Sequence, residues 1–346
     1  MKDTRRRFLK TTGLLAGAGL HAAFRADRRA ATAENAMRTM RYASMPKKDA
    51  VLWQQEVRAK LFDLLEMSDL VAADTDIPLE LETHASREED GYALHELEMN
   101  STPGRRMKFV TTTPTGREGP FPAVIFLAGH GGTRHTVYGE RGGYYHVGRL
   151  LAAGGYVTVS ANISQHAVYE AGRTNMGERL WDLIRCVDYL LARDDVDPQR
   201  IGSGGKSLGG EMVMWLGAMD ERVKANLVSG FLTSMDQMER NHCMCWKLPG
   251  LRELVDFADI YSLIAPRPLL FQNGVDEPAS QFPPALALEV FAELAVTYHD
   301  FEVPENASLV AFKGGHVVHV PSVLGFFDQH LQKNVKLVPF ADRSRL

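Results

Sequence analysis

The stretch RIGSGGKSLGGEMVMWLGAM, residues 200–219, decides how the rest of the chain is interpreted. RIGSGG indicates a short buried strand, although Gly202 and Ser203 are weak strand formers. LGGEMVMWLGAM indicates a helix with an apolar face. Ser207 lies between the two, in a G-x-S-x-G pattern whose glycines permit a tight turn. We expect Ser207 to be an exposed nucleophile with the helix N-terminus behind it. A small residue in a glycine-rich helix start is the alternative.

The segments around this stretch indicate the fold class. From Pro122 onward, short apolar runs alternate with helical patterns, which predicts an α/β fold with a mostly parallel central sheet and helices on both faces. The expected strands are 123–128, 156–160, 200–204, 225–228, 268–272 and 308–312, and the expected helices are 146–153, 176–192, 209–219, 283–294 and 321–332. Upstream, residues 51–67 predict a helix and residues 79–112 predict antiparallel strands.

The N-terminal residues predict an export signal. TRRRFLK, residues 4–10, precedes a short, weakly apolar run and resembles the twin-arginine type of signal. The run is too short and too rich in glycine to span a bilayer. We expect residues 1–33 to be removed after Ala33, with cleavage after Ala23 or a plain basic tail as alternatives. The protein would then pass transiently through the twin-arginine export machinery and be periplasmic or extracellular.

Charge and cysteine content limit the partners. The chain of 346 residues has a net charge of −4, and because residues 1–33 carry +6, the remainder carries −10. An acidic body argues against a nucleic-acid partner. Three cysteines, Cys186, Cys243 and Cys245, are too few for a dense disulfide framework. No second cysteine pair accompanies Cys243 and Cys245 to complete a zinc site, so we expect thiols or one disulfide, no metal and no cofactor.

A serine nucleophile needs an imidazole base and a carboxylate that orients it, and both are found downstream. Asp276 follows the apolar run PLLFQ, and His316 follows two glycines after the last expected strand. We therefore expect a Ser207, Asp276 and His316 triad. Glu277 is the alternative acid and His319 the alternative base. An H-x-x-H zinc pair at 316 and 319 is a third interpretation, but no further ligand supports it.

Other residues are expected to complete the site. The loop GHGGTR, residues 129–134, follows the strand AVIFLA, and its glycines let backbone N–H groups approach a reacting carbonyl oxygen. The expected oxyanion donors are Leu208, His130 and Gly131. We expect residues 34–346 to form one domain, with residues 34–78 as an N-terminal extension and residues 229–264 as a cap over the pocket. The expected pocket residues are Arg134, Lys206, Met235 and Trp246.

Four segments together resemble a known family. AVIFLAGHGG, MGERLWDLIRCVDYLLARDDVDPQRIGSGGKSLGG, DIYSLIAPRPLLFQNGVDEP and FKGGHVVH are similar to the α/β-hydrolase group of acetyl xylan esterase and dienelactone hydrolase-like proteins. The resemblance covers most of residues 50–335. It implies a serine carboxylesterase of the α/β-hydrolase fold with Ser207, Asp276 and His316 as triad. Dienelactone hydrolases carry cysteine at this turn, so the serine favours the esterases.

The residues and the resemblance support one hypothesis and two alternatives. The hypothesis is an exported serine carboxylesterase that hydrolyses short, acetyl-type esters on carbohydrates such as acetylated xylan through an acyl-enzyme. A serine peptidase of prolyl-oligopeptidase type shares the fold and the residue order, although no propeller-sized region precedes the expected strands. A binding protein that keeps the fold without catalysis is the second alternative.

Overall fold

The computed structural model describes residues 37–72 and 77–332. The expected export signal and both of its expected cleavage sites lie outside these residues. Within the described ranges, no helix combines the length and apolar character that crossing a membrane requires.

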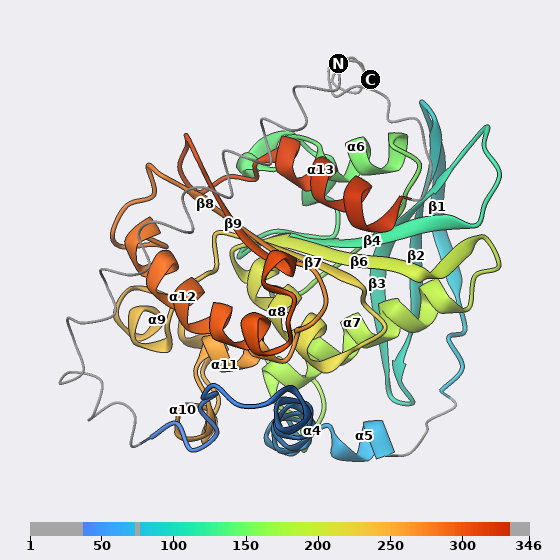
Figure 1. The fold of residues 1–346 in the computed structure, drawn as a ribbon. Coiled ribbons are helices and arrows are strands. Elements are labelled where there is room, and N and C mark those ends of the chain that lie inside the picture. Colours follow the sequence, from blue (N-terminus) through green and yellow to red (C-terminus); the bar gives the residue numbers. More distant parts are fainter. Residues whose placement is uncertain (1–36, 73–76, 333–346) are drawn as a thin grey trace.

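A sheet of nine strands runs through the described part of the chain (Figure 1). Its order is β1-β2-β3-β5-β4-β6-β7-β8-β9. The pairs β1–β2, β2–β3 and β3–β5 are antiparallel. The remaining neighbours in this order, from β5–β4 to β8–β9, are parallel. The predicted mostly parallel sheet with antiparallel strands before it is confirmed. The strands are β1 (Glu82–Glu89), β2 (Tyr92–Thr102), β3 (Arg105–Pro114), β4 (Phe121–Leu127), β5 (Val157–Ala161), β6 (Val196–Lys206), β7 (Ala225–Ser229), β8 (Leu269–Gly274) and β9 (Ala307–Phe312).

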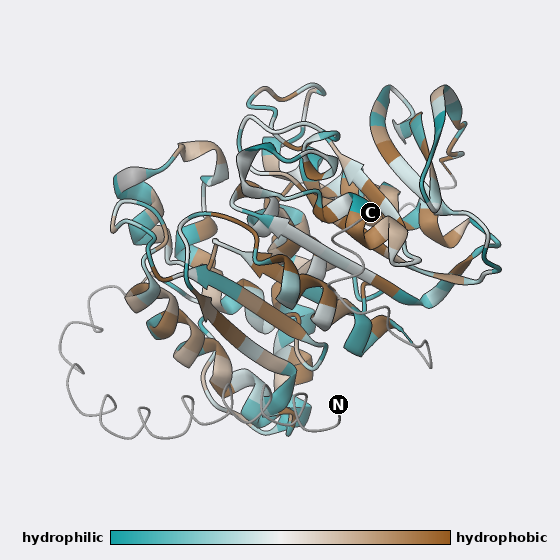
Figure 2. Cartoon of the chain, turned by 90° about the horizontal axis from the view of Figure 1, so that it is seen from above, coloured by the Kyte–Doolittle hydropathy of each residue, from teal (hydrophilic) through white to brown (hydrophobic). Residues whose placement is uncertain are grey.

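Helices cover both faces of the sheet, as predicted (Figure 1). One face carries α6 (Val147–Ala153) and α13 (Val320–Leu331), and the other carries α7 (Asn175–Leu191), α8 (Leu208–Met219) and α12 (Pro284–Asp300). Strand β4 contributes to both layers, because its alternate side chains point to opposite faces. Val124 and Phe126 pack with the first group of helices, whereas Ile125 and Leu127 pack with the second. Figure 2 shows apolar residues both in strands of the sheet and in the helices beside them.

The glycines that weaken the strand propensity of β6 have a packing role. A Cβ atom on Gly202 would lie 2.8 Å from side-chain carbons of Phe327 and Leu331 in α13. A Cβ on Gly204 would lie 2.7 Å from the ring of Phe126. These glycines therefore let large side chains approach the strand closely, and tertiary packing outweighs the low local propensity.

The N-terminal extension docks against the helices of the second face. Helix α4 (Lys47–Leu64), which precedes the short α5 (Ser68–Ala72), confirms the helix predicted over 51–67. Its Val57 and Leu61 are fully buried. The side-chain amide of Gln54 donates to the carbonyl oxygens of Ser262 and Ala265, each at 2.9 Å. The extension is thus part of the core rather than an appendage.

The segment between β7 and β8 was expected to form a cap. It contains α9 (Met235–Asn241), a 3₁₀ turn (Met244–Trp246), α10 (Leu251–Leu254) and α11 (Phe257–Ser262). Helix α11 packs on α12 and α8, whereas the chain around His242 borders the cavity described below. The segment is therefore partly core and partly wall of the cavity.

Candidate active site

Ser207 occupies the strand-to-helix turn that the sequence predicted. β6 ends at Lys206, α8 begins at Leu208, and Ser207 has φ 58° and ψ −124°, a strained conformation for a residue with a side chain. Its N–H donates to the carbonyl oxygen of Ser229 at 2.9 Å, and its own carbonyl oxygen accepts from the N–H of Glu211 at 2.9 Å. The surrounding hydrogen bonds hold the serine in this conformation.

The flanking glycines are sterically required. A Cβ on Gly205 would lie 2.4 Å from the carbonyl oxygen of Gly209, and a Cβ on Gly209 would lie 2.3 Å from that of Leu127. Neither backbone could absorb such a contact without moving. The G-x-S-x-G pattern here is a consequence of close packing between the turn and β4, not a chance combination of common residues.

The structure corrects the predicted acid. His316, on the loop between β9 and α13, places Nδ1 3.2 Å from Oε1 of Glu277, whose side chain is 1% exposed. Asp276 is exposed, and its backbone N–H donates to the carbonyl oxygen of Gly314. The turn after β8 directs Asp276 to solvent and Glu277 inward. The prediction of Asp276 as the partner of His316 is therefore wrong, and the alternative, Glu277, takes that position.

The position of His316 suits a base that acts on Ser207 better than the position of His319 does. His316 lines the same cavity as Ser207. His319 lies at the start of α13, where its Nδ1 is 2.8 Å from Oγ of Ser322 and its ring stacks on Phe312 at 5.0 Å between centroids. Burial lowers the pKa of His319. His319 thus contributes to the packing of α13.

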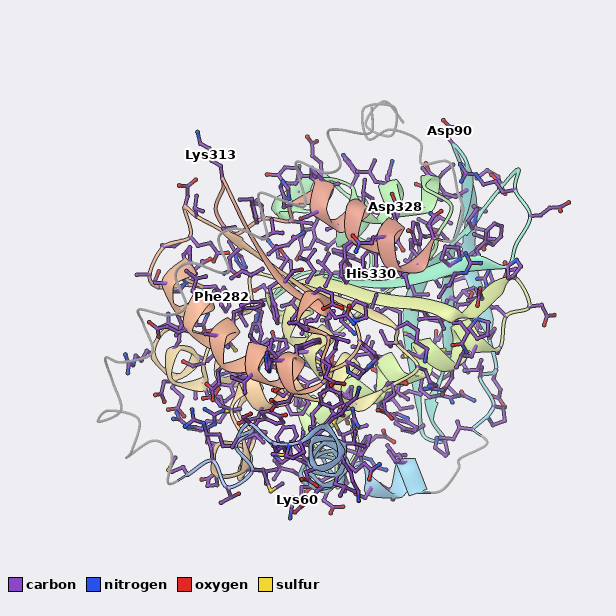
Figure 3. The ribbon with its side chains drawn as sticks, viewed as in Figure 1. Lys60, Asp90, Phe282, Lys313, Asp328 and His330 are labelled. Carbon is purple, nitrogen blue, oxygen red and sulfur yellow. The ribbon has the colours of Figure 1, made fainter. Side chains whose placement is uncertain are left out.

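Two residues, Gly230 and Phe282, hold the imidazole of His316 and the carboxylate of Glu277 in place. Gly230 has φ +59°, and a Cβ there would lie 2.7 Å from Cε1 of His316 and 3.2 Å from Oε1 of Glu277. The ring of Phe282, labelled in Figure 3, stacks on His316 with centroids 5.3 Å apart and an angle of 21°. The N–H of Phe282 donates to Oε2 of Glu277 at 3.2 Å. Backbone on one side and an aromatic ring on the other leave His316 little freedom.

A cavity of about 640 Å³ brings Ser207 and His316 together with the glycine-rich loop after β4. Of the predicted oxyanion residues, His130 and Gly131 line this cavity, and Leu208 directly follows Ser207 at the start of α8. A Cβ on Gly129 would lie 2.9 Å from Cβ of Ser207, so the loop packs directly on the serine. This arrangement is compatible with backbone N–H groups that face an oxygen bound at Ser207.

Of the four residues expected in the pocket, only Lys206 lines this cavity. Lys206 lines the cavity, but its Nζ donates to the carbonyl oxygens of Gly142 at 2.7 Å and His316 at 3.1 Å. Burial lowers the pKa of Lys206. Met235 and Trp246 are fully buried in the core, and Arg134 forms an ion pair with Glu96 at 3.3 Å. None of these last three lines the cavity.

Two other cavity residues, Tyr144 and His242, lie in no motif that marks them as part of a site. Tyr144 accepts a hydrogen bond from the N–H of Gly129 at 2.6 Å and lies under the ammonium of Lys206, 4.8 Å from the ring centroid. His242 stacks on Phe282 at 4.7 Å between centroids. These residues come from loops between β4 and α6 and between β7 and β8, and only the fold brings them together.

Comparison with known proteins relates parts of this chain to hydrolases. The model of the "Prolyl oligopeptidase family" matches residues 144–243, which include Ser207 but neither His316 nor Glu277. The Bacillus subtilis (strain 168) protein named "Putative hydrolase YtaP" is 26% identical over 264 residues, which are 69% of this chain and 87% of that protein.

Solved structures extend the comparison to nearly the whole chain. A structure from Bacteroides fragilis NCTC 9343, described as a "putative acetyl xylan esterase", has 17% identity and a TM-score of 0.62, and the match covers 89% of this chain and 84% of that one. A glucuronoyl esterase from Solibacter usitatus has 16% identity and a TM-score of 0.64, with 84% and 96% covered. The chain has the α/β-hydrolase fold. The predicted fold class is thereby confirmed.

Proposed function

We propose that this α/β-hydrolase-fold protein is a serine carboxylesterase in which Ser207, His316 and Glu277 form the catalytic triad. The observation that carries the proposal is that Ser207, on its strained turn, and His316 line the same cavity. Nδ1 of His316 also contacts the buried carboxylate of Glu277. A nucleophile, a base and a group that orients the base are the minimum that acyl transfer to serine requires.

The reaction follows from these positions. Oγ of Ser207 attacks the ester carbonyl carbon while Nε2 of His316 accepts the hydroxyl proton, and Glu277 accepts a hydrogen bond from Nδ1–H and stabilises the imidazolium. N–H groups of Leu208 and of the loop at His130 and Gly131 stabilise the oxyanion. The alcohol leaves with the proton from His316. Water then gives a proton to His316 and attacks the acyl carbon. The bond from this carbon to Oγ breaks, Oγ takes the proton back from His316, and the acid is released.

For the substrate we propose short acyl esters, of acetyl type, on carbohydrates such as acetylated xylan. The support is the resemblance of the sequence and the names of two structural relatives, an acetyl xylan esterase and a glucuronoyl esterase. The cavity has the size of a small-molecule site and a polar lining that includes Arg141, His242 and Gln281. Such a lining suits sugar hydroxyl groups better than a long apolar acyl chain.

The test combines labelling with turnover. A small fluorophosphonate should add to the folded protein once, on Ser207, as peptide mapping would show. The adduct should be absent from S207A and from denatured protein. Hydrolysis of p-nitrophenyl acetate and release of acetate from acetylated xylan should fall by at least about 10⁴-fold in S207A. An unlabelled folded protein would contradict the triad, whereas labelling without acetate release would contradict only the substrate.

The family match supports one second candidate, a serine peptidase. The matched residues 144–243 belong to the prolyl oligopeptidase model and include Ser207. Peptidases and esterases share the acyl-enzyme route, so the triad does not separate them. Cleavage of a chromogenic proline-containing peptide at a kcat/KM above that for p-nitrophenyl acetate would favour the peptidase.

We also propose that residues 1–33 direct export by the twin-arginine route. The support is the Arg5–Arg6 pair before a weakly apolar run. In a bacterium with an active twin-arginine pathway, the R5K/R6K double variant should accumulate as a cytoplasmic precursor, and the unmodified chain should be processed. Export that is unchanged in the double variant would contradict the route.

A further inference from the structure

Four side chains with metal-binding atoms meet beside the cavity. His130 lies on the loop after β4, His166 on the loop after β5, and Cys243 and Cys245 on the segment between β7 and β8. Nε2 of His130 is 3.1 Å from Sγ of Cys245, and Nε2 of His166 is 3.3 Å from Sγ of Cys243. All four candidate ligand atoms lie within 4.8 Å of one another.

The donor set selects the ion. Two imidazole nitrogens and two thiolate sulfurs are a ligand set of structural zinc sites, in which tetrahedral bonds of about 2.0–2.3 Å separate the ligand atoms by roughly 3.3–3.8 Å. The contact of 3.1 Å is slightly shorter than this range, the contact of 3.3 Å lies at its lower end, and the limit of 4.8 Å for the whole group is longer. Small rotations of side chains would bring the four atoms to this geometry.

A buried cation lies beside one of the two sulfur atoms of the cluster. Arg179 on α7 is fully buried, and its Nη1 lies 3.6 Å from Sγ of Cys245. The same guanidinium donates to the carbonyl oxygen of Gln165, next to His166. A fixed cation beside a sulfur ligand stabilises its negative charge, which is what outer-sphere partners do at metal centres. Both cysteines of the cluster are free thiols, and three of the four ligand residues are exposed to entering ions.

We propose that His130, His166, Cys243 and Cys245 bind one zinc ion. The ion would displace two thiol protons and clamp the segment at Cys243–Cys245 to the loop at Gly129–Gly132, which packs on Ser207. Its role is structural, because four protein ligands complete a tetrahedral zinc site and leave no open position for water or substrate. The existence of the site does not depend on the esterase proposal; only an effect of the ion on catalysis does.

The experiment uses the full chain, purified with a phosphine reductant. Wild-type protein should contain about one zinc ion per chain by elemental analysis. After removal of the metal, titration with Co²⁺ should produce a thiolate-to-cobalt charge-transfer band and the visible bands of tetrahedral Co²⁺. C243S/C245S should lose these bands, and H166A should weaken Co²⁺ binding more than about 100-fold. H135A, which changes a partly exposed histidine outside the cluster, should bind as wild type does.

Further measurements distinguish loss of the zinc site from misfolding of a variant and from failure of the esterase proposal. A chelator should lower the Tm of wild type but not of C243S/C245S, which keeps Cys186 and should remain folded by circular dichroism. Reduced wild type without a charge-transfer band, or equal binding by C243S/C245S, would overturn the site. A mass loss of two hydrogens at Cys243–Cys245 that persists in reductant would assign a disulfide instead. Fluorophosphonate labelling reports on Ser207 in every one of these cases.

Discussion

At the scale of single residues, one turn decides which carboxylate reaches His316. Asp276 and Glu277 are neighbours, and both follow a buried strand, so the sequence offers no periodic signal that separates them. In the structure the N–H of Asp276 donates to Gly314, and this bond sets the direction of the turn. Glu277 is then enclosed beside His316. The choice depends on contacts between β8 and the loop after β9, which no local pattern encodes.

Replacing the two acids separately tests this correction. E277A removes the group that fixes the tautomer of His316, so kcat for p-nitrophenyl acetate should fall by about 10³–10⁴-fold. D276A, which removes an exposed side chain, should change kcat by less than about twofold. Initial rates over a range of pH would measure both. A large loss in D276A together with a small one in E277A would restore the acid predicted from the sequence.

Gly230 is a second residue whose identity the site requires. G230A would place a methyl group against His316 and Glu277 and would also strain a backbone with φ +59°. We expect kcat to fall more than about 10-fold and the free energy of unfolding to fall by roughly 1–2 kcal/mol. G91A is the matched control, since Gly91 has φ +81° and nothing within 4 Å of the added Cβ. It should lose similar stability and keep its activity. Equal activity loss in both variants would contradict the contact argument.

At the scale of elements, the apolar runs of the sequence predicted the parallel strands well. A strand buried on both faces is rich in apolar residues, and β4 (FPAVIFL) is apolar throughout. Strands β7 and β8 are also buried at every position and begin with apolar or mostly apolar residues. The loops between these strands were less predictable. Met235 and Trp246 looked like pocket residues, but they pack inward, whereas His242 reaches the cavity. Which side of an irregular segment faces a cavity depends on its neighbours in space.

Helix α8 makes a prediction of its own because it is buried along its whole length. Its Glu211, one turn after Ser207, has a carboxyl group with no hydrogen-bond partner among the described residues. Burial raises the pKa of Glu211 to about 8, which leaves the group neutral near pH 7. The unfolded chain ionises this group at an ordinary, lower pKa. The folded state therefore binds the extra proton, and its stability should fall as pH rises toward 8.

E211Q removes this titration and keeps the shape of the side chain. The variant should gain Tm relative to wild type, and the gain should be larger at pH 8 than at pH 5, because only at the higher pH does wild type lose stability through the proton equilibrium. Thermal unfolding at the two pH values measures the difference. E253Q, which changes a glutamate on α10, should show no such pH-dependent gain. An E211Q effect that is equal at both pH values would contradict a buried neutral carboxyl.

At the scale of the whole molecule, the zinc proposal and the N-terminal extension concern contacts between distant parts of the chain. The four ligands of the proposed site span residues 130–245. The sequence showed Cys243 and Cys245 but no second cysteine pair, and two histidines from other loops take those positions. Likewise, the extension reaches α11 and α12 through polar side chains, Arg38 and Tyr42, whose partners lie more than 200 residues away. Such contacts join parts of the chain that no local sequence pattern relates.

Arg38 tests how firmly the extension is bound. Its guanidinium lies 2.6 Å from Oδ2 of Asp259, whose side chain is 1% exposed, and 2.9 Å from Glu293. Burial raises the pKa of Asp259 to about 6 even with Arg38 beside it. R38M would leave that carboxylate enclosed without its cation, and the free energy of unfolding should fall by about 3–5 kcal/mol at pH 8. The loss should be smaller at pH 5, where protonation of Asp259 removes the unpaired charge.

K47M breaks an exposed pair with Glu302 in the same extension and should cost less than about 1 kcal/mol. Urea unfolding at both pH values measures these differences, and R38M behaving like K47M would mean that the extension contributes little to the stability of the fold.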